Sequence, residues 1–313
     1  MTESVAAEPE AAPIGVIVMA YGTPASPDDV EAYYTHIRRG RPPSAEQLAD
    51  LRRRYDAIGG VSPLARRTEE QRAALAAALD RLEPERYRVL LGQKHAAPFI
   101  EDAVADLAAG GVERTVGLVL APHHARASVG EYQARAAEAA AEHGVEHRPI
   151  ESWHLEPAYL EFLAAAVSDG LAGLPERTRV LFTAHSLPER ALVDDPYPDQ
   201  LAESAGAVAE RLGLDRGPGW GLAWQSAGAT AEPWRGPDIN EVIPKLAADP
   251  DVDGVLVCAQ GFTSDHLEIV YDLDLESARV AADAGIAFAR TRSLNADPTV
   301  LAALAERVAE VAA

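Results

Sequence analysis

Short runs of apolar and β-branched residues recur along the chain and alternate with longer segments rich in Ala, Glu and Arg. Near-continuous apolar strands that alternate with helices are typical of a parallel sheet covered by helices on both faces. The apolar runs are residues 14–22, 87–95, 114–124, 179–186, 221–226 and 254–261.

Helical periodicity fills most of the intervals between these runs. A chain of 313 residues is long enough for two units of this kind. We therefore predict an α/β fold of two doubly wound, Rossmann-like domains with parallel sheets and an active-site cleft between them. The segments with helical periodicity are 67–82, 99–109, 128–143, 158–173, 199–213 and 265–284.

The domain boundaries follow from the order of these elements. We predict an N-terminal domain over residues 14–125, completed by a returning helix at 297–313, and a C-terminal domain over residues 126–296. Residues 1–13 are acidic, lack the basic start and apolar centre of a signal peptide, and are predicted to be a disordered tail. No apolar run reaches the roughly 18 residues of a membrane helix, so we expect a cytoplasmic protein.

Composition narrows the possible partners. The chain has 28 basic and 49 acidic residues and a formal charge of −21, which argues against nucleic acid or an anionic membrane as a partner. Cys258 is the single cysteine. One thiol excludes an intrachain disulfide, a four-thiolate zinc site and a cysteine-ligated iron–sulfur cluster within the chain. Its apolar surroundings, "GVLVCAQG", predict a buried core thiol.

Polar or aromatic residues follow each predicted strand. In open α/β sheets, ligands bind beyond the carboxyl ends of the strands, so these residues are candidates for one site. Each residue taken alone is better explained as an ordinary polar residue where a strand meets water. The residues are Tyr21, Lys94, His95, His123, His124, His185, Gln225, Ser226 and, a few positions after the last strand, His266.

One candidate is His185, in "FTAHSLPER", which the residues alone leave open between a catalytic base and a structural histidine. A histidine at a strand end is suited to general-base chemistry because it is normally neutral near pH 7 and can accept a proton. The chain contains no G-x-G-x-x-G, G-x-x-x-x-G-K-[ST] or G-x-S-x-G motif, so dinucleotide, nucleoside triphosphate and serine-hydrolase sites lack support.

An acidic stripe occupies the segment "GFTSDHLEIVYDLDLE", residues 261–276. Asp265, Glu268, Asp272 and Glu276 follow at steps of three, four and four, which places them on one face of a helix. Like charges at this spacing repel by about 0.2–0.5 kcal/mol per pair. We expect Asp265 to cap the helix and the phase of the helix to turn His266 away from the stripe.

Eight motifs carry a resemblance to a known family. They occur in the family's order over residues 14–276 and are "MAYGTP", "YYTHIRRGRPP", "RYDAIGGVSPLARRTEEQ", "LGQKHAAPFIEDAV", "TAHSLPER", "DPYPDQLAESA", "WQSAGATAEPWRGPDI" and "GFTSDHLEIVYDLD". With these motifs the chain resembles the ferrochelatases, in particular the coproporphyrin ferrochelatases found in Gram-positive bacteria.

The resemblance implies a two-domain chelatase fold and an enzyme of heme biosynthesis that inserts Fe(II) into coproporphyrin III and releases two protons. Fe(II) is then a substrate, with no permanently bound cofactor, and the family suggests a monomer without stable membrane association. His185 matches the family's invariant histidine, and Glu268 matches the glutamate of its H-x-E motif. A base must remove the pyrrole protons, and imidazole and carboxylate are also plausible transient ligands of Fe(II).

The resemblance also suggests residues that bind the porphyrin. Tyr21 matches a tyrosine on the opposite face of the ring that is a possible iron ligand. Other matches lie at the rim or the wall of the cleft: Arg38, Arg39, Arg41, Ser62, Lys94, His95 and Tyr132. Arginine suits the rim because its guanidinium binds a propionate carboxylate with two hydrogen bonds.

Two features remain open in this comparison. His124 stands where the family commonly has an aromatic residue, so it either contacts the porphyrin or replaces the aromatic wall. Asp272 and Glu276 either form an outer site that passes hydrated divalent cations toward Glu268 or lets protons leave, or are solvated surface.

Two alternative functions differ in substrate or in class. A ferrochelatase specific for protoporphyrin IX is disfavoured by Tyr21, which replaces the "NLG"-type start of that branch. A non-catalytic carrier of tetrapyrrole or metal is conceivable because two-lobed α/β clefts also bind solutes. Retention of both His185 and Glu268 disfavours the carrier.

Overall fold

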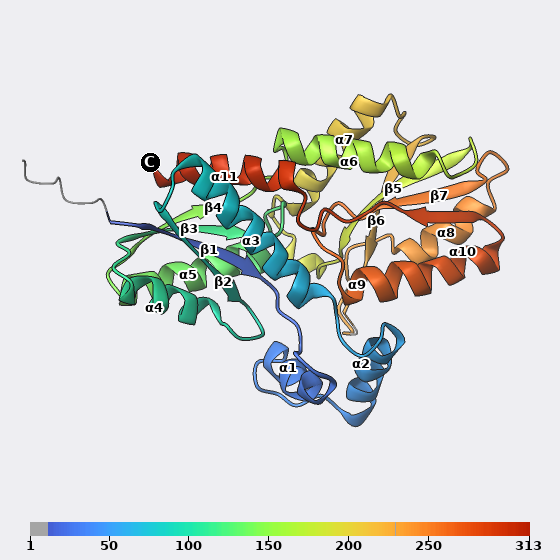
Figure 1. Cartoon of the computed structure of the whole chain (residues 1–313). Helices are drawn as coiled ribbons and strands as arrows, with labels where there is room; N and C mark the ends of the chain where they lie inside the picture. Colours follow the sequence, from blue (N-terminus) through green and yellow to red (C-terminus); the bar gives the residue numbers. More distant parts are fainter. Residues whose placement is uncertain (1–11, 229) are drawn as a thin grey trace, which may run out of the picture.

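The computed structural model describes residues 12–228 and 230–313. The tail predicted at residues 1–13 therefore lies, except for residues 12 and 13, outside the described residues. The described chain forms two four-stranded parallel sheets, each with helices on both faces, as predicted (Figure 1).

The first sheet has the strand order β2-β1-β3-β4. Its middle strand β1 is buried along its whole length, and its side chains alternate between two cores. Val16 and Val18 pack in the core shared with α3 and α11, whereas Ile17 and Met19 pack in the core with α4 and α5. The elements are β1 (Ile14–Ala20), α3 (Leu64–Leu82), β2 (Tyr87–Gln93), α4 (Ile100–Ala109), β3 (Arg114–Val119), η2 (Arg126–Gly130), α5 (Glu131–Glu142), β4 (Glu146–Ile150) and α11 (Pro298–Ala312).

The second sheet repeats this plan with the order β6-β5-β7-β8. On its central strand, Phe182 faces the core that contains α6 and α7, and Leu181 faces the core that contains α8. Cys258 ends β7 and is buried, as predicted. The elements are α6 (Pro157–Leu171), β5 (Thr178–His185), η3 (Glu189–Ala191), α7 (Tyr197–Leu212), β6 (Trp220–Gln225), α8 (Ile239–Ala247), β7 (Gly254–Cys258) and β8 (Ala287–Arg290).

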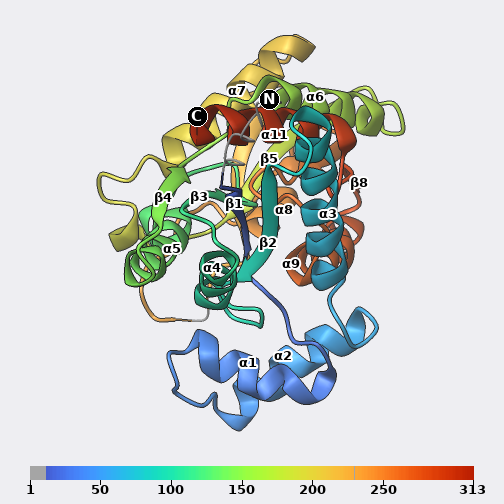
Figure 2. The same cartoon turned by 60° about the vertical axis from the view of Figure 1, so that its left-hand side comes forward.

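One continuous core joins the two sheets, because it contains Val16 of β1 and Phe182 of β5. The final helix α11 packs on α3, β3 and β4 of the first sheet and on α6 of the second (Figures 1 and 2). The boundary predicted at residue 125 comes too early. The later elements α5 and β4 belong to the first sheet, where β4 pairs with β3, so the chain changes sheet only after Ile150.

Two short helices, α1 (Val30–Ile37) and α2 (Ala45–Ala57), lie below the two layers in Figures 1 and 2 and follow a short turn, η1 (Pro27–Asp29). They connect the carboxyl end of β1 to α3. Sequence periodicity does not predict them because each buries little apolar surface: Val30 is the buried residue of α1 and Tyr55 that of α2.

The acidic segment forms a helical run of three parts: α9 (Leu267–Ile269), the π-helix η4 (Val270–Ser277) and α10 (Ala278–Ala284). A π-helix is rare and is frequently found at functional sites. Across the described residues, no helix combines the length and the apolar character that crossing a bilayer requires.

Candidate active site

The structure brings His185 and Glu268 together. His185 is the last residue of β5, and Glu268 lies in the first turn of α9. The Nε2 atom of His185 is 3.5 Å from Oε1 of Glu268. The amide of Gln225, at the end of the neighbouring strand β6, donates a hydrogen bond of 3.0 Å to the backbone carbonyl of Glu268 and holds α9 beside the sheet.

A second imidazole contacts the same carboxylate. Nε2 of His266 is 3.4 Å from Oε2 of Glu268, so each carboxylate oxygen faces one histidine. The expectation that helical phase turns His266 away is wrong. His266 precedes the helix with an extended backbone (φ −157°, ψ −174°), so the phase of the helix does not apply to it.

The surroundings of His185 favour its charged form. Its Nε2 faces Glu268 and its Nδ1 faces the carbonyl oxygen of Ser186, and only an imidazolium can donate to both. Partial burial opposes the charge, but the Glu268 carboxylate outweighs it and raises the pKa of His185 to about 9. The Glu268 carboxylate therefore shifts His185 toward its charged form near pH 7, away from the neutral form expected from the sequence. Burial likewise opposes ionisation of Glu268, yet the charge of His185 holds its pKa well below the usual range.

Asp272 lies one turn further along the stripe and is buried. The hydroxyl of Ser226 donates to Oδ2, and Nη1 of Arg54 on α2 is 3.5 Å from Oδ1. Burial is the main reason that the pKa of Asp272 rises to about 6, and the nearby Glu268 charge adds to it. Arg54 therefore supplies a cation that relieves the repulsion along the stripe.

Glu276 is half-buried, one further step along η4. Among residues 12–228 and 230–313, no group of three or more His, Cys, Asp or Glu side chains has the arrangement to hold a metal ion. The outer cation site at Asp272 and Glu276 remains a proposal.

A second group of predicted residues lies at the end of β1 and β2 in the first half. The side chain of Tyr21 is exposed, and its ring centroid is 4.6 Å from that of His95. Nδ1 of His95 is in turn 3.0 Å from Nδ1 of His36 on α1. Burial, followed by the charge of Lys94, lowers the pKa of His95 to about 3, so His95 is neutral and can serve as donor or acceptor.

Lys94 and Tyr132 form a packed pair beside this group. Nζ of Lys94 is 2.7 Å from Glu131 and 5.2 Å from the ring centroid of Tyr132. Both side chains are buried, so direct contact with a large ligand would require them to move. Desolvation by the surrounding protein raises the pKa of the partly exposed Tyr21, and the charge of Glu268 adds to this rise.

The predicted rim residues flank α1 and α3. Arg38, Arg39 and Arg41 follow α1, and Arg38 and Arg41 each donate to the backbone carbonyl of the other. None of the three has a carboxylate partner within the described part of the chain. Ser62 precedes α3, is buried, and accepts a hydrogen bond from the backbone N–H of Leu64.

His124 makes its hydrogen bonds with residues outside both groups of predicted site residues. Its backbone N–H donates to Oε1 of Gln200 at 2.7 Å, and its Nδ1 is 3.2 Å from the carbonyl oxygen of Glu151. Sequence reasoning missed Arg54, which only the fold brings to Asp272. It named Ser226 and His266 as strand-end candidates but not their partners, Asp272 and Glu268.

Comparisons with known proteins point to one family. The family model described as "Ferrochelatase" matches residues 13–312. A protein named "Coproporphyrin III ferrochelatase" from Anoxybacillus flavithermus is 44% identical, covering 93% of this chain and 94% of its own. The protein of the same name from Bacillus subtilis is 42% identical, covering 93% and 96%.

Solved structures share the fold at low sequence identity. SirB from Bacillus subtilis with Fe3+ superposes with a TM-score of 0.57 at 14% identity, covering 96% of both chains. CbiX, described as the terminal enzyme of siroheme biosynthesis in denitrifying bacteria, has a TM-score of 0.54 at 16% identity and covers 95% of this chain and 98% of its own. On the extent of the family match and the identity to its members, this chain belongs to the ferrochelatase family.

Proposed function

We propose that this protein inserts Fe(II) into coproporphyrin III to give coproheme, with release of two protons. The observation that carries the proposal is the His185–Glu268 pair, at 3.5 Å, where the central strand β5 ends in a chain of the ferrochelatase family. The substrate follows from relatives that are named coproporphyrin III ferrochelatases and are 42–44% identical over nearly the whole chain.

The reaction replaces two pyrrole N–H bonds by bonds to iron, so two protons must leave the ring. Before iron arrives, the Glu268 carboxylate favours a His185 that carries a proton on the nitrogen facing it. An arriving Fe(II) ion repels the imidazolium and favours loss of that proton to solvent. Once the ion has moved from it to the ring, His185 accepts one pyrrole proton, releases it to solvent and then accepts the second, and Glu268 stabilises the imidazolium each time it forms.

Fe(II) must be held weakly before insertion, because it has to transfer to the ring. Imidazole and carboxylate suit this brief contact. We propose that His185 and Glu268 provide it on one face of the porphyrin and that Tyr21, whose side chain is exposed, approaches from the other face. The protein needs no resident cofactor in this scheme. Burial raises the pKa of Cys258 to about 12, so its thiol is a poor candidate for metal ligation.

Substrate preference gives a direct test. Coproporphyrin III carries four propionates and protoporphyrin IX carries two, so the arginines after α1 should favour the first. We expect anaerobic mixing with Fe(II) to metallate coproporphyrin III with the higher kcat/KM, followed by the change in porphyrin absorbance. Equal rates would contradict the substrate assignment. Binding without turnover of either porphyrin would favour the carrier function.

The rim arginines give a second prediction. Replacing Arg38 by Gln, or Arg39 by Gln, should raise KM for coproporphyrin III and leave kcat nearly unchanged, because a propionate contact is equally strong in the ground state and the transition state. Loss of about 1–2 kcal/mol per contact corresponds to a factor of about 5–30. Arg81→Gln, at the exposed far end of α3, is the matched control and should leave KM unchanged. A KM as low as that of the control would remove the residue from the porphyrin site.

A further inference from the structure

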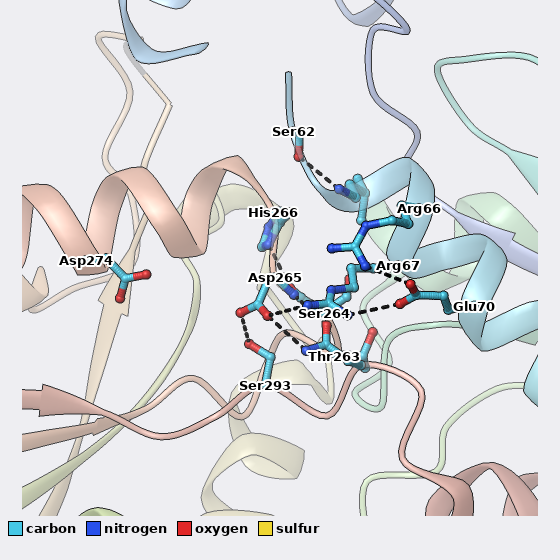
Figure 3. A network of polar contacts seen from close by, with 12 residues as sticks. Ser62, Arg66, Arg67, Glu70, Thr263, Ser264, Asp265, His266, Asp274 and Ser293 are labelled. Carbon is cyan, nitrogen blue, oxygen red and sulfur yellow. Dashed lines mark hydrogen bonds and ion pairs between the residues drawn. The ribbon is translucent and has the colours of Figure 1, made fainter. Parts of the chain in front are cut away.

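Asp265 stands apart from the rest of the acidic stripe because three other segments bind its carboxylate. The hydroxyl of Ser293 donates to Oδ1 at 2.8 Å (Figure 3). The amide of Asn295 donates to Oδ2 at 2.9 Å. Nη2 of Arg290 is 3.2 Å from Oδ1, and Nη2 of Arg67 is 3.9 Å from Oδ2. Asp265 is therefore not the helix cap expected from the sequence; the cap position belongs to His266.

These partners come from both halves of the molecule. Arg67 lies on α3, which packs on the first sheet, and Arg290 ends β8 of the second sheet. Ser293 and Asn295 lie on the connection from β8 to α11, which returns to the first half. The carboxylate of Asp265 thus ties the turn before α9 to α3 and to the crossing between the halves.

The residues next to Asp265 are anchored in the same way. Its own backbone N–H donates to Oδ1 of Asn295 at 3.0 Å, so the Asn295 side chain binds Asp265 at two points. The hydroxyl of Thr263 donates at 2.9 Å to the carbonyl of Leu120, beyond the end of β3. The amide of Gln71 on α3 donates at 3.0 Å to the carbonyl of Asn295.

Glu268 follows this anchored turn by three positions and has no cationic partner other than histidines within the described chain. Its distance from His185 therefore depends on where the turn places the start of α9. We propose that Asp265 is a positioning residue for iron insertion, which holds Glu268 against His185 by fixing this turn to both halves. The proposal rests on the catalytic role of Glu268 proposed above.

Asp274 offers a matched control. It lies on η4, apart from the turn (Figure 3), and pairs with the same Arg290, whose Nε is 2.6 Å from its Oδ1. Asp274→Ala therefore removes a carboxylate from Arg290 and leaves the contacts of Asp265 with Ser293 and Asn295 in place. An effect of Asp265→Ala that came only from releasing Arg290 would appear equally in Asp274→Ala.

The experiment compares Asp265→Ala, Asp265→Asn and Asp274→Ala with the wild type, using anaerobic Fe(II) insertion into coproporphyrin III. Misplacement of a catalytic group by about 1 Å can cost about 100-fold. We expect Asp265→Ala to lower kcat by about 10–100-fold with KM for the porphyrin within about twofold of wild type. Asp265→Asn, which keeps an acceptor for Ser293, should be intermediate, and Asp274→Ala should match the wild type.

NMR titration of the His185 imidazole adds a readout that does not depend on turnover. If Glu268 withdraws, the pKa of His185 must fall in Asp265→Ala and stay unchanged in Asp274→Ala. That result supports the positioning role even if the wild type metallates neither porphyrin, an outcome that would overturn only the proposed function. An unchanged His185 pKa in folded Asp265→Ala or Asp265→Asn would overturn the positioning role, as would equal effects of Asp265→Ala and Asp274→Ala.

Discussion

Replacing His185 by Asn is expected to lower kcat for Fe(II) insertion by about 10²–10⁴-fold, the contribution typical of a positioned general base. Asn keeps a donor that can reach the carbonyl of Ser186, as Nδ1 of His185 does, and removes only the nitrogen that faces Glu268. The fold should persist, because His185 is at the carboxyl end of β5 and outside the hydrophobic cores. Anaerobic absorbance assays with coproporphyrin III measure the change.

The chain provides a control with the same chemistry at another place. Nε2 of His154 is 2.9 Å from Oε2 of Glu203, a second histidine–glutamate pair without contact to the first. His154→Asn should keep kcat near the wild-type value once circular dichroism confirms folding. If His185→Asn retained kcat within about threefold of wild type, His185 would not be the base, since about 10²-fold is the smallest effect expected of one.

The sequence predicts most of the architecture because the apolar runs are buried on both faces. β1, for example, alternates between two cores and leaves a nearly continuous apolar signal. It does not predict β8, which has four residues, all only partly buried. It also misses α1 and α2, since a helix that buries one residue has no apolar stripe to detect.

The candidate site, like the fold, could be predicted from the sequence only in part. His185 and Glu268 are identified by motif, and the fold brings them to 3.5 Å. The charge state of His185 could not be predicted, because it depends on a carboxylate from a distant segment rather than on the local sequence. Asp265 was misread as a cap for a related reason: its partners Ser293 and Asn295 reach it only through the return of the chain toward α11.

The His185–Glu268 pair also predicts how the free energy of unfolding depends on pH. The pKa of His185 is raised from 6.5 to about 9, so its stabilising contribution is fully present below 6.5 and is lost as the pH rises through about 9. The pKa of Glu268 lies below its ordinary 4.5, so its contribution is present above 4.5 and is lost as the pH falls further. The His185–Glu268 interaction therefore stabilises the fold chiefly between about pH 4.5 and pH 9.

Glu268→Gln should combine a loss of rate with a shift of the pH profile. In the wild type, kcat/KM should increase with pH, and the midpoint of this rising limb of the pH profile should lie near pH 9. The reason is that the free enzyme must lose the proton of His185 before this residue can act as a base. The amide removes the charge that raises this pKa, while partial burial continues to lower it. We therefore expect the limb to move to about 6.5 or below, and kcat to fall by about 10²–10⁴-fold because the imidazolium formed in the reaction loses its counter-charge.

The lowered pKa of His185 and the loss of the counter-charge change the rate at neutral pH in opposite directions, so the measured rate distinguishes them. In Glu268→Gln a larger fraction of His185 is neutral at pH 7, so a role limited to setting that pKa would make the variant faster than the wild type there. A slower variant with a limb at lower pH shows that the carboxylate also acts on the reacting centre. Glu203→Gln, which alters the pair with His154, should change neither quantity. A limb that stayed near 9 in Glu268→Gln would mean that the wild-type limb is not due to the His185–Glu268 interaction, and the proposed assignment of base and counter-charge would be wrong.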